Sequence, residues 1–506
     1  MLAVVMTLGL TATSCVSSED NPVEPTPPPI TPEMFQQKLE AISGISDITV
    51  KELNNGTEVY YFNVEQLIDH NAPSKGTFKQ RVAMTFKGAD HVTVLYTEGY
   101  AMGSDGKRIR WTDLYDYYNA NTIEVEHRYF GESLPEPLED VNYTYLNAEQ
   151  AVEDMHYVVS LIKNSKICTG KWIATGISKS GVNAALYAYY SEKKGYDDID
   201  VYVPFCSPIL TEIESKKIGT YMITEAGKST GILDKLNAIP QKLVQQPTRD
   251  EFIKMIWEKE GKIIEQAKDI IIRAIFGPDA EIDEADILPI LQKRQLATRF
   301  HQYYENLFGK LAYIPAPILK DYIPDPETAD LATLDRFIKE TYQDIRQMIT
   351  EKAGNRAGLT DEELVNRRKQ DPQFPYYIQA YKELGTYDFD YSLIEGNGYI
   401  TEKDIRDTYS RRNNLIFFER YAKQYSNKMT KDFLDNFLPT SKKKMVFVYC
   451  ENDPWTGGAI PDSKNPNVVK FVSPGGCHSD KILDEDHFPK EWRDKIIKQI
   501  NTFLGL

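Results

Sequence analysis

The chain has 506 residues, of which 41% are apolar, enough to bury a large core and to form two or three domains. Its formal net charge of −16 at pH 7 argues against nucleic acid as a partner, because binding phosphate groups requires a basic surface. An acidic surface also keeps an exported protein soluble.

The N-terminal segment predicts export and a lipid anchor. Residues 1–13 are almost wholly apolar, but this run is too short to span a bilayer as a helix. Ser14 and Cys15 follow, an order that resembles a bacterial lipoprotein signal in which Cys15 becomes the lipidated first residue. An ordinary secretory signal is the alternative. Residues 16–30 are polar and proline-rich and are expected to form a disordered tether. The expected location is therefore the bacterial cell envelope, in the periplasm or at the cell surface.

The next part of the chain predicts a mixed sheet. Strand-forming runs alternate with helical runs in its second half, and this alternation is typical of a largely parallel sheet covered by helices on both faces. The expected strands lie at 48–50, 59–64, 80–86, 91–96, 122–126, 172–177 and 199–205, and helices at 148–164 and 184–190.

A nucleophile elbow is predicted where the strand at 172–177 ends. Gly176 and Ser178 precede a helix-forming stretch, and such a strand-to-helix turn exposes the serine hydroxyl at the top of a sheet. Glycine is needed there because a side chain would collide with neighbouring backbone. The usual pattern is Gly-x-Ser-x-Gly, whereas this chain has Ser180 at the last position and Gly181 one residue later. Taken alone, the pattern is equally compatible with an ordinary turn.

The pattern changes between residues 211 and 437. Charged, helix-prone runs dominate and strand signals are nearly absent, with helices expected at 251–275, 287–308, 331–352, 360–369 and 401–437. We expect a helical cap that is inserted between two strands of the sheet and roofs the serine. Solvated helices packed around the sheet are the alternative.

Two more strands are expected at 444–450 and 468–472, and each is followed by a candidate catalytic residue. Asp453 follows the first and His478 follows the second. The order Ser178, Asp453, His478, with each residue past the end of a strand, is the order that an α/β-hydrolase requires. In isolation, Asp453 is compatible with simple turn chemistry and His478 with a solvated loop.

The expected fold class is therefore α/β, an α/β-hydrolase fold with an inserted helical cap domain. The assigned segments are 1–30 (signal and tether), 31–210 (first part of the hydrolase domain), 211–437 (cap) and 438–506 (second part of the hydrolase domain).

Several motifs together carry a family resemblance. They are Gln66–Pro73 with Gly76–Arg81, Glu126–Ser133, Gly176–Lys179, Asn452–Trp455 and Gly476–His478. In these motifs the chain resembles the secreted bacterial prolyl tri/tetrapeptidyl aminopeptidases, proline-specific serine peptidases that are distantly similar to lysosomal Pro-X carboxypeptidase. The resemblance spans roughly residues 60–206 and 440–485, and it implies release of short proline-containing peptides from free N-termini. Family members typically read Gly-x-Ser-Lys-Gly-Gly, so Ser180 is a departure.

The triad implies acyl-enzyme chemistry. Ser178 attacks the scissile carbonyl, His478 takes the hydroxyl proton and returns it to the leaving amine, and Asp453 orients the imidazole. The oxyanion needs backbone donors, and we expect the N–H of Lys179 together with that of Gly99 or Tyr100.

An aminopeptidase must also bind a free ammonium group, for which a buried carboxylate is suited. Glu126, at a strand end in the family motif, is the first candidate and Glu98 the second. The alternative is that Glu126 pairs with Arg128 or another buried cation as scaffolding. Tyr129 and Trp455 are candidates for an aromatic proline pocket, although aromatic residues more often belong to a core.

No metal or other cofactor is expected, because no histidine–acid cluster has zinc-ligand spacing. His70 and His127 precede the nucleophile and His156 lies on an expected helix, so none is favoured as the base. A disulfide is permitted outside the cytoplasm, but its pairing stays open. The cysteines beyond the signal are Cys168, Cys206, Cys450 and Cys477.

Two other functions stay open. A carboxylic-ester hydrolase uses the same triad on the same fold, and fold alone does not define the substrate. A catalytically inactive, lipid-anchored binding protein is the second alternative, supported by Ser180. The expected partners are peptides with proline near a free N-terminus. Nucleic acid is not expected to bind, and the only expected membrane contact is through the lipid anchor.

Overall fold

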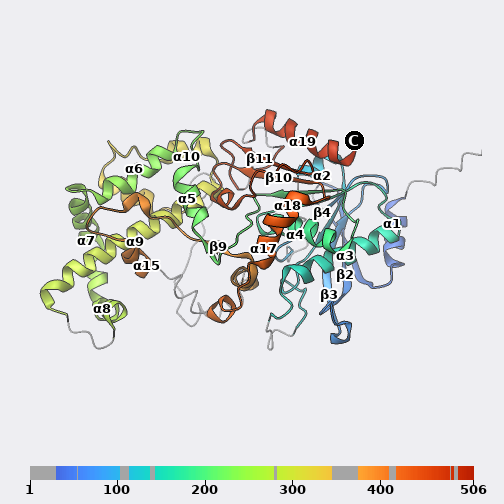
Figure 1. The fold of residues 1–506 in the computed structure, drawn as a ribbon, viewed down its shortest axis with the longest axis horizontal. Helices are drawn as coiled ribbons and strands as arrows, with labels where there is room; N and C mark the ends of the chain where they lie inside the picture. The colour runs from blue at the N-terminus through green and yellow to red at the C-terminus, as the bar shows by residue number, and fades with distance from the viewer. Residues whose placement is uncertain are drawn as a thin grey trace, which may run out of the picture.

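The structure is a computed structural model that describes residues 30–53, 55–102, 113–136, 143–277, 282–344, 374–408, 418–478, 480–483 and 488–506. A mixed sheet with its covering helices forms one end of an elongated molecule (Figure 1). The other end is formed by helices α6 (Leu233–Val244), α7 (Thr248–Gln266), α8 (Lys268–Phe276) and α9 (Glu284–Tyr313). The signal, with the predicted lipidation site Cys15, and the helix expected at 360–369 lie outside the described residues.

The sheet has nine strands, in the order β1-β2-β3-β5-β4-β6-β7-β10-β11. The strands β1 to β3 pair antiparallel and β3 is antiparallel to β5, whereas every pairing from β5 to β11 is parallel. The bounds are β1 Ile45–Glu52, β2 Glu58–Leu67, β3 Thr77–Thr85, β4 Thr93–Tyr96, β5 Asn121–Val125, β6 Trp172–Ile177, β7 Val201–Phe205, β10 Met445–Cys450 and β11 Val468–Ser473. The expected mixed sheet and its strand positions are confirmed.

Both faces of the sheet are covered by helices, because successive side chains of a strand point to opposite faces. In β10, Phe447 and Tyr449 pack in the core that includes α1, α3 and α4, while Val446 and Val448 pack in the core that includes α2 and α19. The covering helices are α1 Pro32–Glu40, α2 Asp113–Tyr118, α3 Ala148–Asn164, α4 Lys179–Lys194 and α19 Lys490–Leu504. This arrangement confirms the α/β-hydrolase fold.

The region between β7 and β10 is almost entirely helical. Its helices are α5 Lys216–Thr224, α6 Leu233–Val244, α7 Thr248–Gln266, α8 Lys268–Phe276, α9 Glu284–Tyr313, α10 Ala316–Tyr322, α11 Leu331–Lys339, α14 Phe374–Gln379, α15 Glu402–Asp407, α17 Lys428–Asp432 and α18 Leu438–Thr440. A second hydrophobic core joins residues of α5, α6, α7, α9 and α11, separate from the cores of the sheet. We refer to residues 211–437 as the cap.

The helices of the cap differ in length from the sequence prediction: α9 extends beyond the expected 287–308 at both ends, whereas others are shorter or divided. The run expected at 251–275 is divided at Ala267, and α11 ends at Lys339 because Glu340 adopts an extended conformation. The single helix expected at 401–437 is wrong, since the described part contains α15, α17 and a π-helical segment at Phe433–Phe437. Two-residue strands, β8 Glu214–Ser215 and β9 Thr386–Tyr387, also pair within the cap. Among the described helices, none is long and apolar enough to cross a membrane.

Candidate active site

The predicted nucleophile elbow is present between β6 and α4. Ser178 lies between the two elements with φ 60° and ψ −128°, a conformation that is costly for a residue with a side chain. A Cβ atom on Gly176 would lie 2.5 Å from the carbonyl carbon of Ser180, and one on Gly181 would lie 2.5 Å from the carbonyl oxygen of Phe205. The tight packing of the elbow therefore requires glycine at 176 and 181.

Position 180 tolerates a side chain because the Ser180 hydroxyl has polar partners. It accepts the Gly99 N–H at 3.0 Å and donates to Glu98 Oε1 at 3.3 Å. Both partners lie in the loop that follows β4. The departure from the family pattern thus connects the elbow to this loop instead of distorting the turn.

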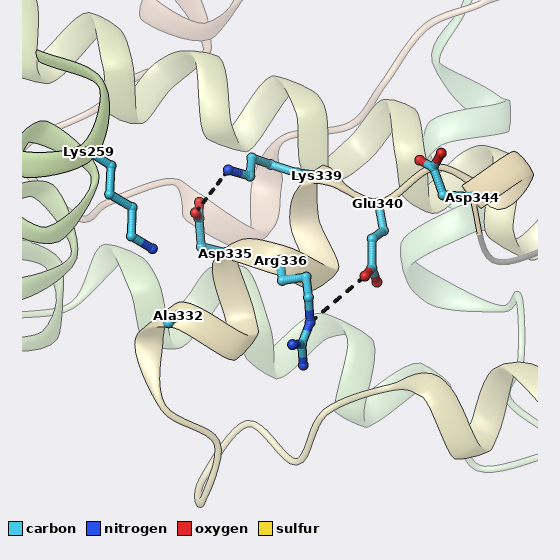
Figure 2. Close-up of a pocket in the computed structure, with 7 residues that line it drawn as sticks. All are labelled: Lys259, Ala332, Asp335, Arg336, Lys339, Glu340 and Asp344. Carbon is cyan, nitrogen blue, oxygen red and sulfur yellow. Dashed lines mark ion pairs between the residues drawn. The ribbon is translucent and has the colours of Figure 1, made fainter. Parts of the chain in front are cut away.

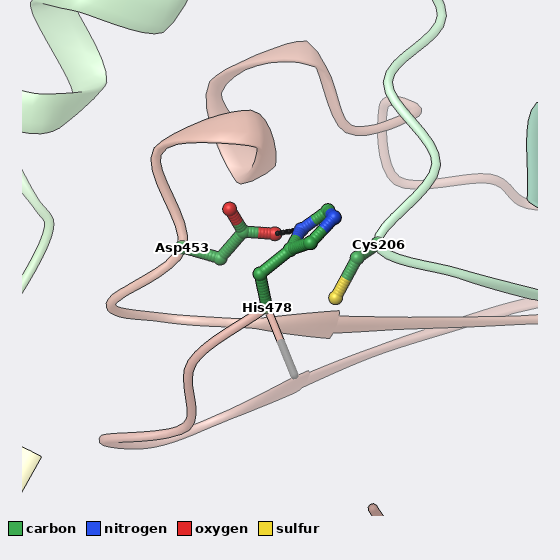
Figure 3. A group of neighbouring side chains, drawn as sticks. All are labelled: Cys206, Asp453 and His478. Atoms are coloured by element: carbon green, nitrogen blue, oxygen red, sulfur yellow. Dashed lines mark hydrogen bonds and ion pairs between the residues drawn. The ribbon is translucent and has the colours of Figure 1, made fainter. Parts of the chain in front are cut away.

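The aspartate and histidine of the predicted triad are paired. Asp453 follows β10, and its Oδ2 accepts a hydrogen bond from His478 Nδ1 at 2.7 Å (Figure 3). Its Oδ1 accepts the Trp455 N–H at 3.1 Å. Asp453 is fully buried and His478 is 6% exposed. Because Nδ1 donates to the carboxylate, the imidazole keeps Nε2 as its proton acceptor.

The cap contributes to the position of this histidine. The backbone N–H of His478 donates to the carbonyl oxygen of Ala312, near the end of α9, at 2.8 Å, and the ring of Tyr313 lies edge-on at 5.7 Å between centroids. Among the hydrogen bonds of the described residues, none joins the Ser178 hydroxyl to His478. Such nucleophile–base contacts often form only when substrate is bound.

A small pocket lies against Ser178. Its walls come from the elbow, the loop after β7, the cap and the turn after Asp453, and its volume of about 20 Å³ holds about one water molecule. The lining residues are Ser178, Lys179, Val182, Pro208, Leu210, Tyr376, Leu384, Gly385 and Trp455. Trp455 therefore borders the serine as expected, and its ring is edge-on to Phe308 and Tyr387. The cap residues Tyr376 and Leu384 could not be placed from sequence, because no local motif marks them.

Glu126 does not occupy the predicted place of an ammonium anchor. It is fully buried, and its carboxylate accepts hydrogen bonds from the N–H groups of Met102 and Glu132 and from the Ser133 hydroxyl. Arg81 approaches it at 3.4 Å. Desolvation raises the pKa of Glu126, partly offset by these partners. The scaffolding alternative therefore describes Glu126, with Arg81 as the cation in place of Arg128.

Tyr129 is also placed differently from the prediction. It is buried in an apolar cluster with Leu146, Ile378 and Tyr381, which joins the sheet domain to the cap, and its hydroxyl donates to Glu136 at 3.2 Å. It does not line the pocket beside Ser178. Packing against the cap, which the sequence could not show, accounts for the difference.

Glu98 engages the N–H groups that were expected to form half of the oxyanion hole. Its Oε1 accepts from Gly99 N at 2.8 Å and from Tyr100 N at 2.9 Å. Glu98 is 2% exposed and does not line the pocket. The predicted role of Gly99 or Tyr100 as the second oxyanion donor, and that of Glu98 as an ammonium anchor, therefore disagree with the structure.

The role of the Lys179 N–H as an oxyanion donor stays a prediction. Lys179 is the first residue of α4, and the N–H groups of a first helical turn have no intrahelical acceptor. Its side chain is buried, with Nζ donating to the Gly99 carbonyl at 2.5 Å and lying 4.9 Å from the centre of the Phe130 ring. Burial lowers the pKa of Lys179 to about 7, while Glu98 and Glu383 partly oppose this shift.

Cys206 lies beside the His478–Asp453 pair, and no local sequence motif marks this proximity. It follows β7 with φ 43°, and its sulfur and one ligand atom each of Asp453 and His478 lie within 4.8 Å of one another (Figure 3). Contact with Cys450, together with burial and the Asp453 carboxylate, raises the pKa of the Cys206 thiol. The cysteines at 168, 206, 450 and 477 are all free thiols.

A larger hollow lies on the cap between α7 and α11, with a volume of about 300 Å³. Its charged side chains pair with one another, Lys339 with Asp335 at 3.4 Å and Arg336 with Glu340 at 3.8 Å (Figure 2). It contains no nucleophile beside a base. The chemistry therefore favours the small pocket at Ser178 over the larger hollow.

Comparisons with known proteins agree with these features. Residues 31–251 match the model of a protein family, the PS-10 peptidases S37. The prolyl tri/tetrapeptidyl aminopeptidase of Streptomyces mobaraensis is 24% identical over 456 residues, which cover 88% of this chain and 81% of that protein.

Solved structures are similar at a lower level. The proline iminopeptidase of Mycobacterium smegmatis is 12% identical, with a TM-score of 0.36, over 87% of this chain and 98% of that chain. The esterase LipA of Xanthomonas oryzae is 10% identical, with a TM-score of 0.30, over 93% and 94% of the respective chains.

The fold and the elbow define the protein as an α/β-hydrolase. The sequence matches refine this class, since the family segment contains both the Glu126–Ser133 motif and Ser178. The match of residues 31–251 to the S37 peptidase model and the similarity to the Streptomyces aminopeptidase agree with the family resemblance of the motifs.

Proposed function

We propose that this protein is a serine exopeptidase that releases short proline-containing peptides, of two to four residues, from free N-termini. The observation that carries the proposal is the buried Asp453–His478 hydrogen bond at the C-terminal edge of the sheet, the edge at which Ser178 stands on its strained turn. The name of the Streptomyces relative supports the choice of substrate.

The proposed mechanism follows from the charge that each group carries. His478 Nε2 removes the proton of Ser178 as the hydroxyl attacks the carbonyl, and the resulting imidazolium is stabilised by the Asp453 carboxylate at 2.7 Å. The same proton then passes to the leaving amine, and water hydrolyses the acyl-enzyme. The backbone N–H of Lys179 is the first oxyanion donor, and loss of one such donor typically raises the barrier by about 3 kcal/mol.

Substrate entry requires movement of the cap in this proposal. The pocket at Ser178 has room for about one water molecule, far less than a prolyl residue needs. Tyr376 and Leu384 are the cap side chains that border it. Displacement of these two side chains opens an apolar, aromatic-lined space next to Trp455, which suits the proline ring. Since the carboxylates of Glu126 and Glu98 are engaged within the protein, ammonium recognition falls to another group.

We further infer that the enzyme is exported and anchored by a lipid on Cys15. The support is the apolar run of residues 1–13 followed by Ser14 and Cys15. Metabolic labelling with a fatty acid should mark the native protein and not Cys15→Ala. Equal labelling of both proteins would contradict the anchor.

A fluorophosphonate probe tests the nucleophile. Native protein should be labelled, and Ser178→Ala should neither react nor cleave an Ala-Ala-Pro reporter. Ser191→Ala, which removes another buried serine of α4, is the matched control and should react normally. Full activity of Ser178→Ala would contradict the proposal, and native protein that binds no probe would support an inactive binding protein.

Mass spectrometry of the products tests the substrate class. A peptide library with free and blocked N-termini should yield fragments of two to four residues ending in proline, only from free N-termini. Cleavage of simple esters without cleavage of any peptide would show an ester hydrolase instead.

A further inference from the structure

The cluster of Cys206, Asp453 and His478 combines ligand types that are found together in metal sites. It offers a thiol, an imidazole and a carboxylate, and the three ligand atoms lie within 4.8 Å of one another (Figure 3). Thiolate and imidazole favour zinc and softer ions of the same charge. We propose that these three residues bind a thiophilic divalent cation such as Zn²⁺ or Cd²⁺, and that the bound ion inhibits the enzyme. The inhibition rests on the proposed function, whereas ion binding does not.

The geometry is close to that of a tetrahedral site. Bond lengths of about 2.3 Å to sulfur and about 2.0 Å to nitrogen and oxygen place the ligand atoms about 3.3 to 3.6 Å apart. The Nδ1 and Oδ2 atoms, now 2.7 Å apart, must separate by about 0.6 Å. The sulfur has to approach the other two ligand atoms by at most about 1.3 Å, since its present separation from them is no more than 4.8 Å. Rotations of these side chains provide both adjustments, and water supplies the fourth ligand.

The backbone at Cys206 directs the sulfur into this cluster. Residues in a regular strand alternate between the two faces of the sheet, but Cys206 leaves β7 with φ 43°, a left-handed conformation rare for cysteine. Its N–H still donates to the Val448 carbonyl at 2.8 Å, so the strained residue is held firmly against β10. Strained backbone of this kind is typical of functional positions.

Charge balance favours a divalent ion in this buried place. The ion displaces the proton from the Cys206 thiol, which passes to solvent, and a metal–sulfur bond forms in its place. The imidazole proton moves from Nδ1 to Nε2, so that His478 coordinates through Nδ1 without change of charge. One thiolate and one carboxylate then neutralise the two positive charges, and a neutral site avoids the cost of burying net charge.

This proton shift explains the inhibition. In the metal-bound state Nε2 carries the proton, so it cannot accept another from Ser178 and the general base is lost. The Asp453 carboxylate is at the same time taken from its role of stabilising an imidazolium. The ion is therefore an inhibitor of this enzyme and not a cofactor of its reaction.

Cadmium binding to the reduced, full-length protein tests the site directly. The native protein should bind one Cd²⁺ with an ultraviolet thiolate-to-metal charge-transfer band. Cys206→Ser should lose the band and bind Cd²⁺ at least about tenfold more weakly. Removal of a residue that only hydrogen-bonds to a metal ligand already lowers metal affinity by about that factor, and Cys206 is itself a ligand in this proposal. Cys168→Ser is the matched control, a buried free thiol elsewhere in the fold, and should behave as the native protein.

A second measurement keeps the proposal testable if Cys206→Ser does not fold. X-ray absorption of the native protein with one equivalent of Zn²⁺ should show one sulfur ligand with nitrogen and oxygen ligands. A shell without sulfur, a cadmium band that persists in Cys206→Ser, or a band lost equally in Cys168→Ser would overturn the site.

Kinetics connect the site to activity. After preincubation with Zn²⁺, which allows for slow entry into a buried site, native enzyme and Cys168→Ser should lose cleavage of the Ala-Ala-Pro reporter and recover it with a chelator. Cys206→Ala should resist, each variant being compared with its own metal-free rate. Equal inhibition of Cys206→Ala would overturn the inhibitory role. An inactive native protein with a Cys206-dependent cadmium band would refute the proposed function and leave the ion site standing.

Discussion

Two buried aspartates of this protein accept hydrogen bonds from histidines at nearly the same distance. His478 donates to Asp453 at 2.7 Å, and His70 lies 2.8 Å from Asp154. The surroundings differ. Arg128 binds both oxygens of Asp154, at 2.7 and 2.6 Å, whereas among the ion pairs of the described residues Asp453 has only His478. The two pairs therefore differ in how much negative charge is left for the imidazole.

The difference shows that a histidine–aspartate contact is not by itself a catalytic feature. At Asp154 the guanidinium already neutralises the carboxylate and also donates to the carbonyls of Leu67 and Ile68, so the pair holds several segments together. At Asp453 the carboxylate remains available to stabilise an imidazolium at the C-terminal edge of the parallel strands. The family motif around Arg128 is thus a structural feature of the fold.

The largest expected effect comes from exchanging each aspartate for asparagine. Asp453→Asn should lower kcat by about 10⁴-fold, because the imidazole is then held in the wrong tautomer. Asp154→Asn should leave the kcat of the folded fraction within about tenfold of the native value, because Asp154 has a structural role. Reporter kinetics on protein with native circular dichroism measure both. Similar kcat losses in the two variants would abolish the contrast.

Substitution of Arg128 should lower the stability of the fold and not the rate of the catalysed reaction. Arg128→Met leaves the Asp154 carboxylate buried without its cation, and such changes lower the free energy of unfolding by about 3–5 kcal/mol. Urea denaturation measures this loss. Lys79→Met, which breaks an exposed ion pair with Asp47, is the control and should change stability by about 1 kcal/mol or less. An unchanged stability of Arg128→Met would contradict the scaffold role.

Substitution of Glu126 should have a smaller effect on stability, and it tests whether this carboxylate has a structural or a substrate-binding role. Glu126→Gln removes one acceptor of the Met102, Glu132 and Ser133 hydrogen bonds, and it should lower the free energy of unfolding by about 1–3 kcal/mol. KM should change equally for free-amine and N-acylated peptides. A selective rise in KM for free-amine peptides would restore Glu126 as the ammonium anchor.

A further expected effect concerns the pH dependence of stability and Lys179. Burial lowers the pKa of Lys179 from 10.5 to about 7 in the folded protein, so between these values the unfolded state binds more protons than the folded state. Stability must then rise with pH across this window. The free energy of unfolding of native protein minus that of Lys179→Met should therefore increase from pH 7 to pH 10. A flat or falling difference would show that the buried amine keeps its proton.

Local sequence patterns were sufficient for the sheet and the elbow. Each strand of the nine-stranded sheet carries its own apolar or alternating pattern, and Gly176, Ser178 and Gly181 meet steric demands that act within a few residues. The positions of Asp453 and His478 also followed from strand ends, because the C-terminal ends of parallel strands meet at one edge. These conclusions need only short-range geometry and the order of the chain.

The predictions for Glu126, Tyr129 and Glu98 depended on partners that the sequence does not reveal. Glu126 was expected to face substrate, but Arg81 and the loop at Met102 surround it. Whether a buried carboxylate is open or already satisfied depends on every donor that the fold brings to it.

The amino-acid sequence by itself thus determined the sheet, the elbow and the order of the candidate triad, because these depend on side-chain periodicity, glycine sterics and strand direction. Only the tertiary structure decided which polar groups meet: Arg128 with Asp154, the Ser180 hydroxyl with Glu98 and the Gly99 N–H, and Cys206 with Asp453 and His478. The reason is physical. Hydrogen bonds act over about 3 Å in space. Packing of the whole molecule brings Cys206 and His478, far apart in the chain, to within 4.8 Å of each other.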